Sequence, residues 1–132
     1  MRAPDGERIR KAIDAAEHGT TGRVGVRIVA GRTADALEDA RRHFANANLH
    51  EHEHRNGVVF FVAPKARRFA VFGDKEIHAH VGDAFWQRLV DDIQPYFAKG
   101  ELTEGLLLGI ARVGEQLRLH FPSRPQAAKE SV

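Results

Sequence analysis

The alternation of apolar and polar residues along the chain predicts three β-strands. Residues 24–29 alternate between apolar and polar or small side chains, as in a strand with one buried face. Residues 58–63 are apolar without alternation, which is typical of a strand buried on both faces and covered by helices on both sides. Residues 68–72 are rich in apolar and aromatic side chains and form a third strand.

Four segments repeat their apolar residues at helical spacing, and each begins with a residue suited to capping a helix N-terminus. The predicted N-caps are Asp5, Thr33, Asp83 and Thr103. Gly19 is placed to end the first helix, since glycine tolerates the left-handed conformation that often follows a helix. Pro95 is expected to kink or end the third helix, because proline has no backbone N–H to donate.

The connections between these elements predict the topology. The helix between the first two strands favours a parallel pair, and the short connection between the second and third strands requires an antiparallel pair. We therefore expect an α/β fold, a three-layer α/β/α sandwich with a small mixed central β-sheet flanked by helices. A single domain would span residues 1–122, and residues 123–132 would form a flexible polar tail.

Composition narrows the classes of function. The chain has 132 residues with 20 basic and 18 acidic side chains, a net charge of +2, and this balance argues against a nucleic-acid partner. The absence of cysteine excludes disulfides, thiolate metal sites and cysteine nucleophiles. No apolar run approaches the roughly 20 residues of a transmembrane segment. The N-terminal residues also lack the apolar stretch of a signal peptide, so we expect a cytoplasmic protein.

The predicted topology brings several polar residues to one end of the sheet, where the first two strands begin and the third ends. The candidate binding residues there are Thr20, Thr21, Arg55, Asn56 and Asp74. Asp74 is also the candidate ligand for a hard cation, with Glu17 as a second carboxylate. The alternative interpretation of Asp74 is a turn-forming residue directly after Gly73.

A run of alternating histidine and glutamate is the most conspicuous local pattern. In an extended segment His50, His52 and His54 would share one side and could hold Zn²⁺, Ni²⁺ or Cu²⁺, and in a helix His50 and His54 would share a face. We interpret the run as a solvated loop that binds metal only adventitiously, because a loop offers no surrounding groups to orient the ligands. His78 and His80 repeat the spacing and receive the same interpretation.

Sequence motifs for common catalytic mechanisms are missing. The chain has neither of the glycine-rich loops that hold phosphates, and the zinc motif H-E-x-x-H does not occur. The G-x-S-x-G turn of serine hydrolases is also absent, and the two serines, Ser123 and Ser131, lie in the predicted tail. The sequence therefore supplies no recognisable nucleophile.

Several short motifs, in order and at matching spacing, resemble the TPM domain family over roughly residues 5–122. They include Glu17-x-x-Thr20-Thr21-Gly22 near the start, Arg55-Asn56-Gly57-Val58 and Gly73-Asp74-Lys75-x-Ile77 in the middle, and Gly114-x-x-Leu117-x-x-His120-Phe121-Pro122 near the end. The second half is similar to the soluble bacterial branch of the family. This resemblance implies a small β-sheet between helices, in agreement with the pattern above.

The resemblance also implies a range of functions. The family includes a thylakoid acid phosphatase, a modulator of a receptor and bacterial members that bind Ca²⁺ or Mg²⁺. This sequence departs from it at Arg23, where relatives commonly carry glutamate, and in its tail, which lacks the acidic residues of soluble relatives. Both changes remove negative charge, so we expect no required cofactor and only weak binding of Ca²⁺ or Mg²⁺.

Two functions of different classes follow. The first is a non-enzymatic binding or accessory module for a protein partner. The alternative is a weak Mg²⁺- or Ca²⁺-dependent hydrolase of phosphate esters, similar to an acid phosphatase. In that alternative Asp74 would bind the cation, a metal-bound water would attack, and Arg55 would hold the phosphate oxygens.

Overall fold

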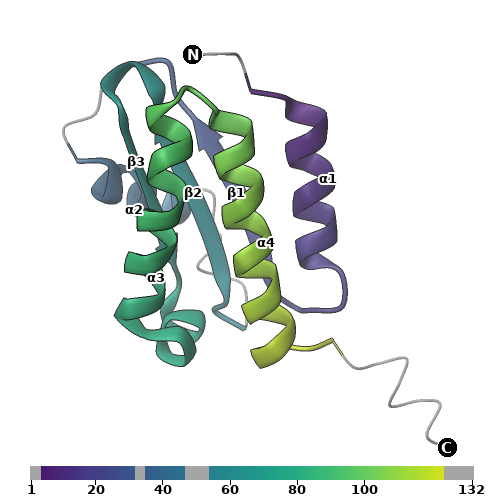
Figure 1. Cartoon of the computed structure of the whole chain (residues 1–132). Coiled ribbons are helices and arrows are strands. Elements are labelled where there is room, and N and C mark those ends of the chain that lie inside the picture. Colours follow the sequence, from purple (N-terminus) through teal and green to yellow (C-terminus); the bar gives the residue numbers. More distant parts are fainter. Residues whose placement is uncertain (1–3, 32–34, 47–53, 124–132) are drawn as a thin grey trace, which may run out of the picture.

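The computed structural model describes residues 4–31, 35–46 and 54–123. Within these ranges the chain forms an alternating series of helices and strands, shown in Figure 1. The elements are α1 (Gly6–Glu17), β1 (Arg23–Ile28), α2 (Ala36–Asn46), β2 (Gly57–Ala63), the short 3-10 helix η2 (Pro64–Ala66), β3 (Arg68–Gly73), α3 (Lys75–Ala98) and α4 (Leu102–His120). The three predicted strands are confirmed to within one residue at each end.

The sheet has the predicted mixed topology, with the strand order β1-β2-β3. β1 runs parallel to β2, with Arg23 beside Gly57, and β2 runs antiparallel to β3, with Val58 beside Gly73. The beginnings of β1 and β2 and the end of β3 therefore meet at one end of the sheet. This is the end at which the sequence places its candidate binding residues.

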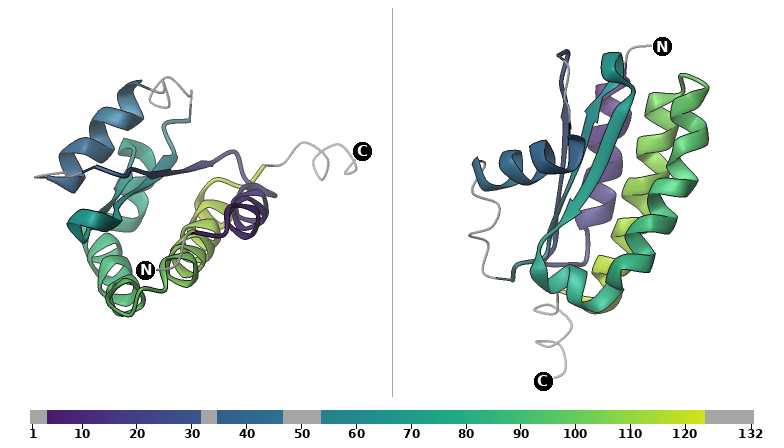
Figure 2. Two further views of the ribbon diagram at one scale, coloured as in Figure 1. Left: turned by 90° about the horizontal axis from the view of Figure 1, so that it is seen from above. Right: turned by 90° about the vertical axis from the view of Figure 1, so that its left-hand side faces the viewer.

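Helices cover both faces of the sheet, which confirms the three-layer sandwich. Figure 2 shows α1, α3 and α4 side by side on one face and α2 on the other. All seven residues of β2 are buried: Val59 and Phe61, on the α2 side, are as shielded as Phe60 on the opposite side. The uninterrupted apolar run in the sequence of this strand therefore reflects its position in the centre of the sheet, between two helical layers.

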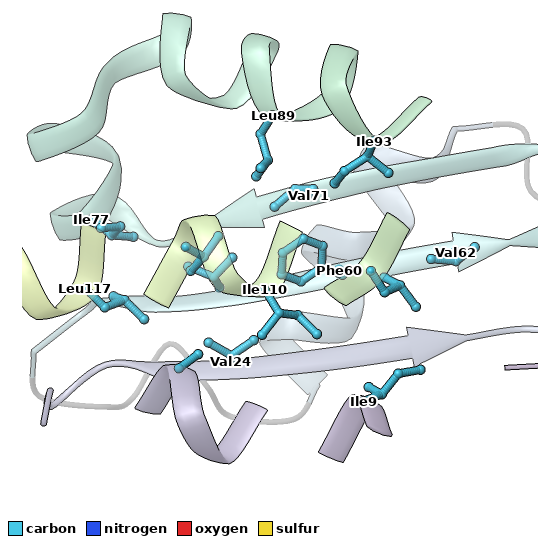
Figure 3. Close-up of a cluster of buried hydrophobic side chains, with 14 of the residues drawn as sticks. Ile9, Val24, Phe60, Val62, Val71, Ile77, Leu89, Ile93, Ile110 and Leu117 are labelled. Atoms are coloured by element: carbon cyan, nitrogen blue, oxygen red, sulfur yellow. The ribbon is translucent and has the colours of Figure 1, made fainter. Parts of the chain in front are cut away.

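The larger of the two cores lies between the sheet and the helices α1, α3 and α4 (Figure 3). Phe60 of β2 projects into it and packs against Ile93 and Ile110, which come from α3 and α4. A Cβ atom at Gly109 of α4 would lie 2.7 Å from both Phe60 and Ile93. Glycine at that position therefore lets α4 approach the sheet closely.

The predicted third helix is the second of two helical segments that α3 joins across a kink at Gly82, directly before Asp83. The first segment was not predicted. Asp74, not Asp83, is the N-cap of α3: its side chain accepts a hydrogen bond from the Lys75 N–H. Gly82 interrupts the helix with φ 78° and ψ 170°, so the apolar periodicity that continues beyond it has a different phase from the first turns. The helix also continues past Pro95 to Ala98, because the proline removes only its own N–H and the last turn closes behind it.

The predicted caps have mixed outcomes. Asp5 caps α1 by accepting from the Arg8 N–H, and Gly19 follows the helix with φ 79°, both as expected. The Thr103 cap is wrong, because α4 begins at Leu102 and the Thr103 hydroxyl instead accepts from the Asp5 N–H, linking the start of α1 to the start of α4. Thr33 lies outside the described residues.

Candidate functional site

The loop between α1 and β1 is fixed to the end of α4 by Thr20. The buried Thr20 hydroxyl lies 2.6 Å from the Phe121 carbonyl oxygen and 3.0 Å from that of Leu117, and it accepts a hydrogen bond from the Gly22 N–H. The Thr21 N–H also donates to the Phe121 carbonyl. Thr20 therefore holds two segments of the fold together and has little of its hydroxyl left to offer a ligand.

Glu17 is engaged by the backbone of the first strand. Its carboxylate accepts a hydrogen bond from the Val24 N–H at 2.8 Å, which ties the last turn of α1 to the beginning of β1. Among the described residues no group of three or more histidine or carboxylate side chains is arranged to hold a metal ion. Neither Glu17 nor Asp74 therefore belongs to a cluster of three metal-ligating side chains among the described residues.

Asn56 lies at the centre of the predicted site and is completely buried. Its side-chain Nδ2 donates to the Thr21 hydroxyl at 3.0 Å, which connects the approach to β2 with the approach to β1. Within the described structure, its Oδ1 atom has no hydrogen-bond partner. A buried acceptor without a donor is uncommon, and it leaves one polar atom here that the surrounding chain does not use.

Arg55 and Asp74 form the strongest polar contact at this end of the sheet. Arg55 donates from Nε to Oδ2 at 2.6 Å and from Nη2 to Oδ1 at 2.8 Å, a two-pronged geometry that matches guanidinium to carboxylate. Asp74 is 4% exposed and also accepts from the Lys75 N–H. The side-chain hydrogen bonding to Asp74 raises the pKa of Arg55 above its already high value, so the guanidinium stays charged throughout the physiological range.

The backbone positions this ion pair from both sides. The Asp74 N–H donates to the Gly57 carbonyl, and the Glu76 N–H donates to the Arg55 carbonyl. Arg55 itself has φ 50°, a left-handed conformation that non-glycine residues adopt only when their surroundings require it. Position 73, directly before Asp74, requires glycine because the Trp86 ring packs against it. A Cβ there would lie 2.4 Å from that ring.

The structure brings the candidate binding residues together at one end of the sheet, but it divides them into separate contacts. Thr21 pairs with Asn56, Arg55 pairs with Asp74, and Thr20 binds the end of α4. The capping role of Asp74 is not among the predictions from the sequence. The signal was available, since an aspartate followed by a glutamate two positions later is typical of a helix start.

The histidine run is only partly covered by the structure. His50 and His52 lie outside the described residues, and His54 is exposed. The adventitious metal-binding interpretation of His50, His52 and His54 therefore remains a prediction. Of the second pair, His78 accepts a hydrogen bond from the Trp86 indole N–H at 2.9 Å, and the ring of His80 stacks on that of His120.

The fold and this polar end define the class of protein as a small three-layer α/β/α domain whose candidate site lies where β1 and β2 begin. The TPM domain family model matches residues 2–116, and the chain belongs to this family. No helix among the described residues is both long enough and apolar enough to cross a membrane.

Several solved structures resemble the chain, among them the following two. The NMR structure of the BA42 protein from the psychrophilic bacterium Bizionia argentinensis is 31% identical, with a TM-score of 0.78, and the match covers 92% of this chain and 86% of that one. The N-terminal domain of the cg2496 protein from Corynebacterium glutamicum is 16% identical, with a TM-score of 0.65 and coverage of 84% and 70%. The second likeness concerns the fold alone. No curated protein matches this chain.

Proposed function

We propose that this TPM domain is a non-enzymatic binding module, acting in the cytoplasm, that recognises a protein partner through the end of the sheet formed by Thr20, Thr21, Arg55, Asn56 and Asp74. This surface is called the sheet-start surface below. The partner is a protein and not a nucleic acid, in keeping with a net charge of only +2.

The observation that carries this proposal is the closed pair of Arg55 and Asp74. A catalytic base, a nucleophile or a metal ligand needs an accessible lone pair, whereas both oxygens of Asp74 accept hydrogen bonds and the residue is 4% exposed. The accessible groups nearby are mainly donors, from the partly exposed Arg55 and the exposed Arg23 and Lys75, with the exposed carboxylate of Glu76 beside them. Such a surface suits recognition of carbonyl and carboxylate groups on another protein.

The competing function is metal-assisted hydrolysis of a phosphate ester. It would require Arg55 to leave Asp74 so that the carboxylate could bind Ca²⁺ or Mg²⁺ while the guanidinium held the phosphate. A direct assay separates the two classes: hydrolysis of para-nitrophenyl phosphate at acidic and neutral pH, with and without each cation. We expect no turnover above that of an Asp74→Asn variant, and cation-dependent turnover lost in that variant would overturn the proposal.

Partner binding is tested by photo-crosslinking in cells of the source organism. A photo-reactive amino acid would replace Lys75, which is exposed beside Asp74, or Lys65, which is exposed in η2 at the opposite end of the sheet. We expect a discrete adduct with one protein from position 75 and none from position 65. Equal adducts from both positions, or none from position 75, would contradict recognition through the sheet-start surface.

A further inference from the structure

The outer edge of β1 carries backbone groups that no neighbouring strand uses. The Val29 N–H donates inward to the Val62 carbonyl of β2 at 2.9 Å. Since backbone groups alternate in direction along a strand, the N–H groups of Val24, Val26 and Ile28 point outward, away from β2. Glu17 accepts the first of these, but over residues 4–31, 35–46 and 54–123 no group accepts from Val26 or Ile28 on that side.

The helical layer is wider than the sheet it covers. Three strands span about 10 Å between their outer axes, whereas three helices side by side span about 16–20 Å. Figure 2 shows α1 as the outermost helix on the β1 side, packed against α4. The contact with α4 is close, because a Cβ at Gly114 would lie 2.9 Å from the Cα of Ala16. α1 therefore overhangs a strip beside β1 that contains no strand of the described chain.

The apolar side chains along this strip are incompletely covered. Val26 and Ile28 are only partly buried, although they project into the same core as their β2 neighbours Phe60 and Val62, which are 1% and 2% exposed. Ile13 of α1 is partly buried in the same way. An additional strand under α1 would complete the burial of these side chains.

The opposite face of β1 is basic, and among the described residues the core under α2 does not extend over it. α2 packs on β2 and β3, and its core includes no residue of Arg23–Ile28. Arg23 and Arg27 are exposed on this face, separated by Gly25, because every second side chain of a strand shares one side. The pKa of His43 in α2 is lowered by burial and, in second place, by the charge of Arg27, which locates Arg27 on the α2 side.

We propose that the outer edge of β1 binds an extended segment of a partner protein as a fourth strand, with apolar side chains facing α1 and acidic side chains facing Arg23 and Arg27. The backbone groups of Val26 and Ile28 supply the hydrogen bonds, and the two faces supply the selectivity. The inference rests on the proposed function in taking the partner to be a protein. It concerns a different surface from the sheet-start surface, so the two can fail independently.

Charge favours such a partner over a second copy of this chain. Antiparallel pairing of two β1 edges would bring Arg23 and Arg27 of one copy beside those of the other, and like charges on neighbouring strands are destabilising. Charged side chains on edge strands commonly prevent this kind of self-association. The same arginines would attract a strand that carries carboxylates at alternate positions.

The probe is a synthetic peptide of about ten residues with alternating valine and glutamate, capped at both ends and fluorescently labelled. We expect it to bind, and we expect the same peptide with lysine in place of glutamate not to bind. Two further peptides carry N-methyl groups on all valine amides or on all glutamate amides, which face opposite sides of an extended strand. At least one of them must lose binding; retention by both would overturn strand addition.

Matched variants locate the site. Arg27→Glu should weaken binding of the valine–glutamate peptide about tenfold or more and favour the lysine peptide, because charge reversal replaces attraction by repulsion. Arg68→Glu, an exposed arginine on the far strand β3, should leave both affinities unchanged. Val26→Pro removes one outward N–H without removing a bond to β2 and should also abolish binding. If Val26→Pro does not fold, Arg27→Glu still decides, and unchanged binding by Arg27→Glu overturns the proposal.

Amide hydrogen exchange, measured residue by residue, gives the independent readout. In the free chain the amides of Val26 and Ile28 should exchange quickly while that of Val29 is protected, and the peptide should protect the first two selectively. Protection at the sheet-start surface instead would overturn the proposal, as would protection of Val26 and Ile28 without peptide at concentrations where the chain dimerises. Crosslinking from Lys75 and the phosphatase assay report on the proposed function separately.

Discussion

Arg55 and Asp74 meet through two parallel hydrogen bonds of 2.6 Å and 2.8 Å, and the same Asp74 carboxylate caps the first turn of α3. A residue two positions before β2 is thereby joined to the residue that follows β3. The pair closes the end of the sheet at which Asp74 is the candidate ligand for a cation. Arg55 and a divalent cation would therefore compete for the same two oxygens.

This competition predicts how the chain responds to Ca²⁺ and Mg²⁺. We expect at most a small rise in melting temperature for the wild type at tens of millimolar cation, and a larger rise for Arg55→Gln, which frees the carboxylate. Binding to the native state stabilises it by RT ln(1 + [L]/Kd), about 1.4 kcal/mol at ten times Kd. Arg23→Glu, which replaces a positive charge at the start of β1 by a carboxylate, should act in the same direction.

Asp74→Asn is the control for the cation titration, because asparagine retains a capping side chain but has no charge. It should abolish any cation-dependent shift, alone or combined with Arg55→Gln. A full shift in Asp74→Asn would show that the cation binds elsewhere. A smaller shift in Arg55→Gln than in the wild type would show that Arg55 does not compete for Asp74.

The hydrogen bond between the partly buried Thr21 and the fully buried Asn56 predicts non-additive stability. Thr21→Val keeps the shape but removes the hydroxyl that accepts from the Asn56 amide, leaving a buried donor unpaired at a cost of about 1–3 kcal/mol. Asn56→Leu in addition removes that donor, together with the Oδ1 atom that has no partner within the described structure. In urea unfolding, the loss of stability in the double variant Thr21→Val with Asn56→Leu should be smaller than the sum of the losses in the two single variants. Strictly additive losses would contradict a direct pair.

The architecture could be predicted from the sequence because its strongest determinant is local. Residues 58–63 are apolar at every position, and that pattern alone requires helices on both faces of a central strand. Connection lengths then fix the strand directions. The first turns of α3 were missed because Gly82 breaks the helical phase and His78 and His80 are exposed, so no apolar stripe marks them.

The candidate site was predictable in place but not in chemistry. The topology alone brings Asn56 and Asp74 to one end of the sheet, because antiparallel pairing places the start of β2 beside the end of β3. That Arg55 turns onto Asp74 depends on its left-handed backbone and on the hydrogen bond from the Glu76 N–H to its carbonyl. Both features depend on contacts between residues far apart in the sequence, and neither residue spacing nor hydrophobic periodicity indicates such contacts.

His43 predicts a pH dependence of stability with a definite sign. Burial, and then the charge of Arg27, lower the pKa of His43 below its usual value of 6.5. The unfolded chain therefore binds more protons than the native chain just below that pH, so this contribution to stability is complete above pH 6.5 and is lost as the pH falls through the native pKa. The urea midpoint of the wild type should therefore fall relative to that of His43→Gln on acidification.

Arg27→Gln tests the cause of that shift. It should reduce the pH dependence without removing it, because burial is the larger cause and is left unchanged. A wild type that becomes more stable than His43→Gln as the pH falls from 7.5 to 5.5 would contradict the lowered pKa.

The contact between α1 and α4 predicts opposite results for two glycine substitutions. A Cβ at Gly114 would lie 2.9 Å from the Cα and the Cβ of Ala16, so the two helix backbones would have to separate. Overpacking of this kind costs about 1–3 kcal/mol, whereas alanine in place of glycine stabilises a helix by about 1 kcal/mol. We therefore expect Gly114→Ala to destabilise the chain. Gly6→Ala is the matched control, since no atom lies within 4 Å of its Cβ position, and it should be neutral or slightly stabilising. Urea unfolding measures both variants. If Gly114→Ala is as stable as Gly6→Ala, α1 is not held against α4 at this distance. In that case α1 would also not cover the strip beside β1.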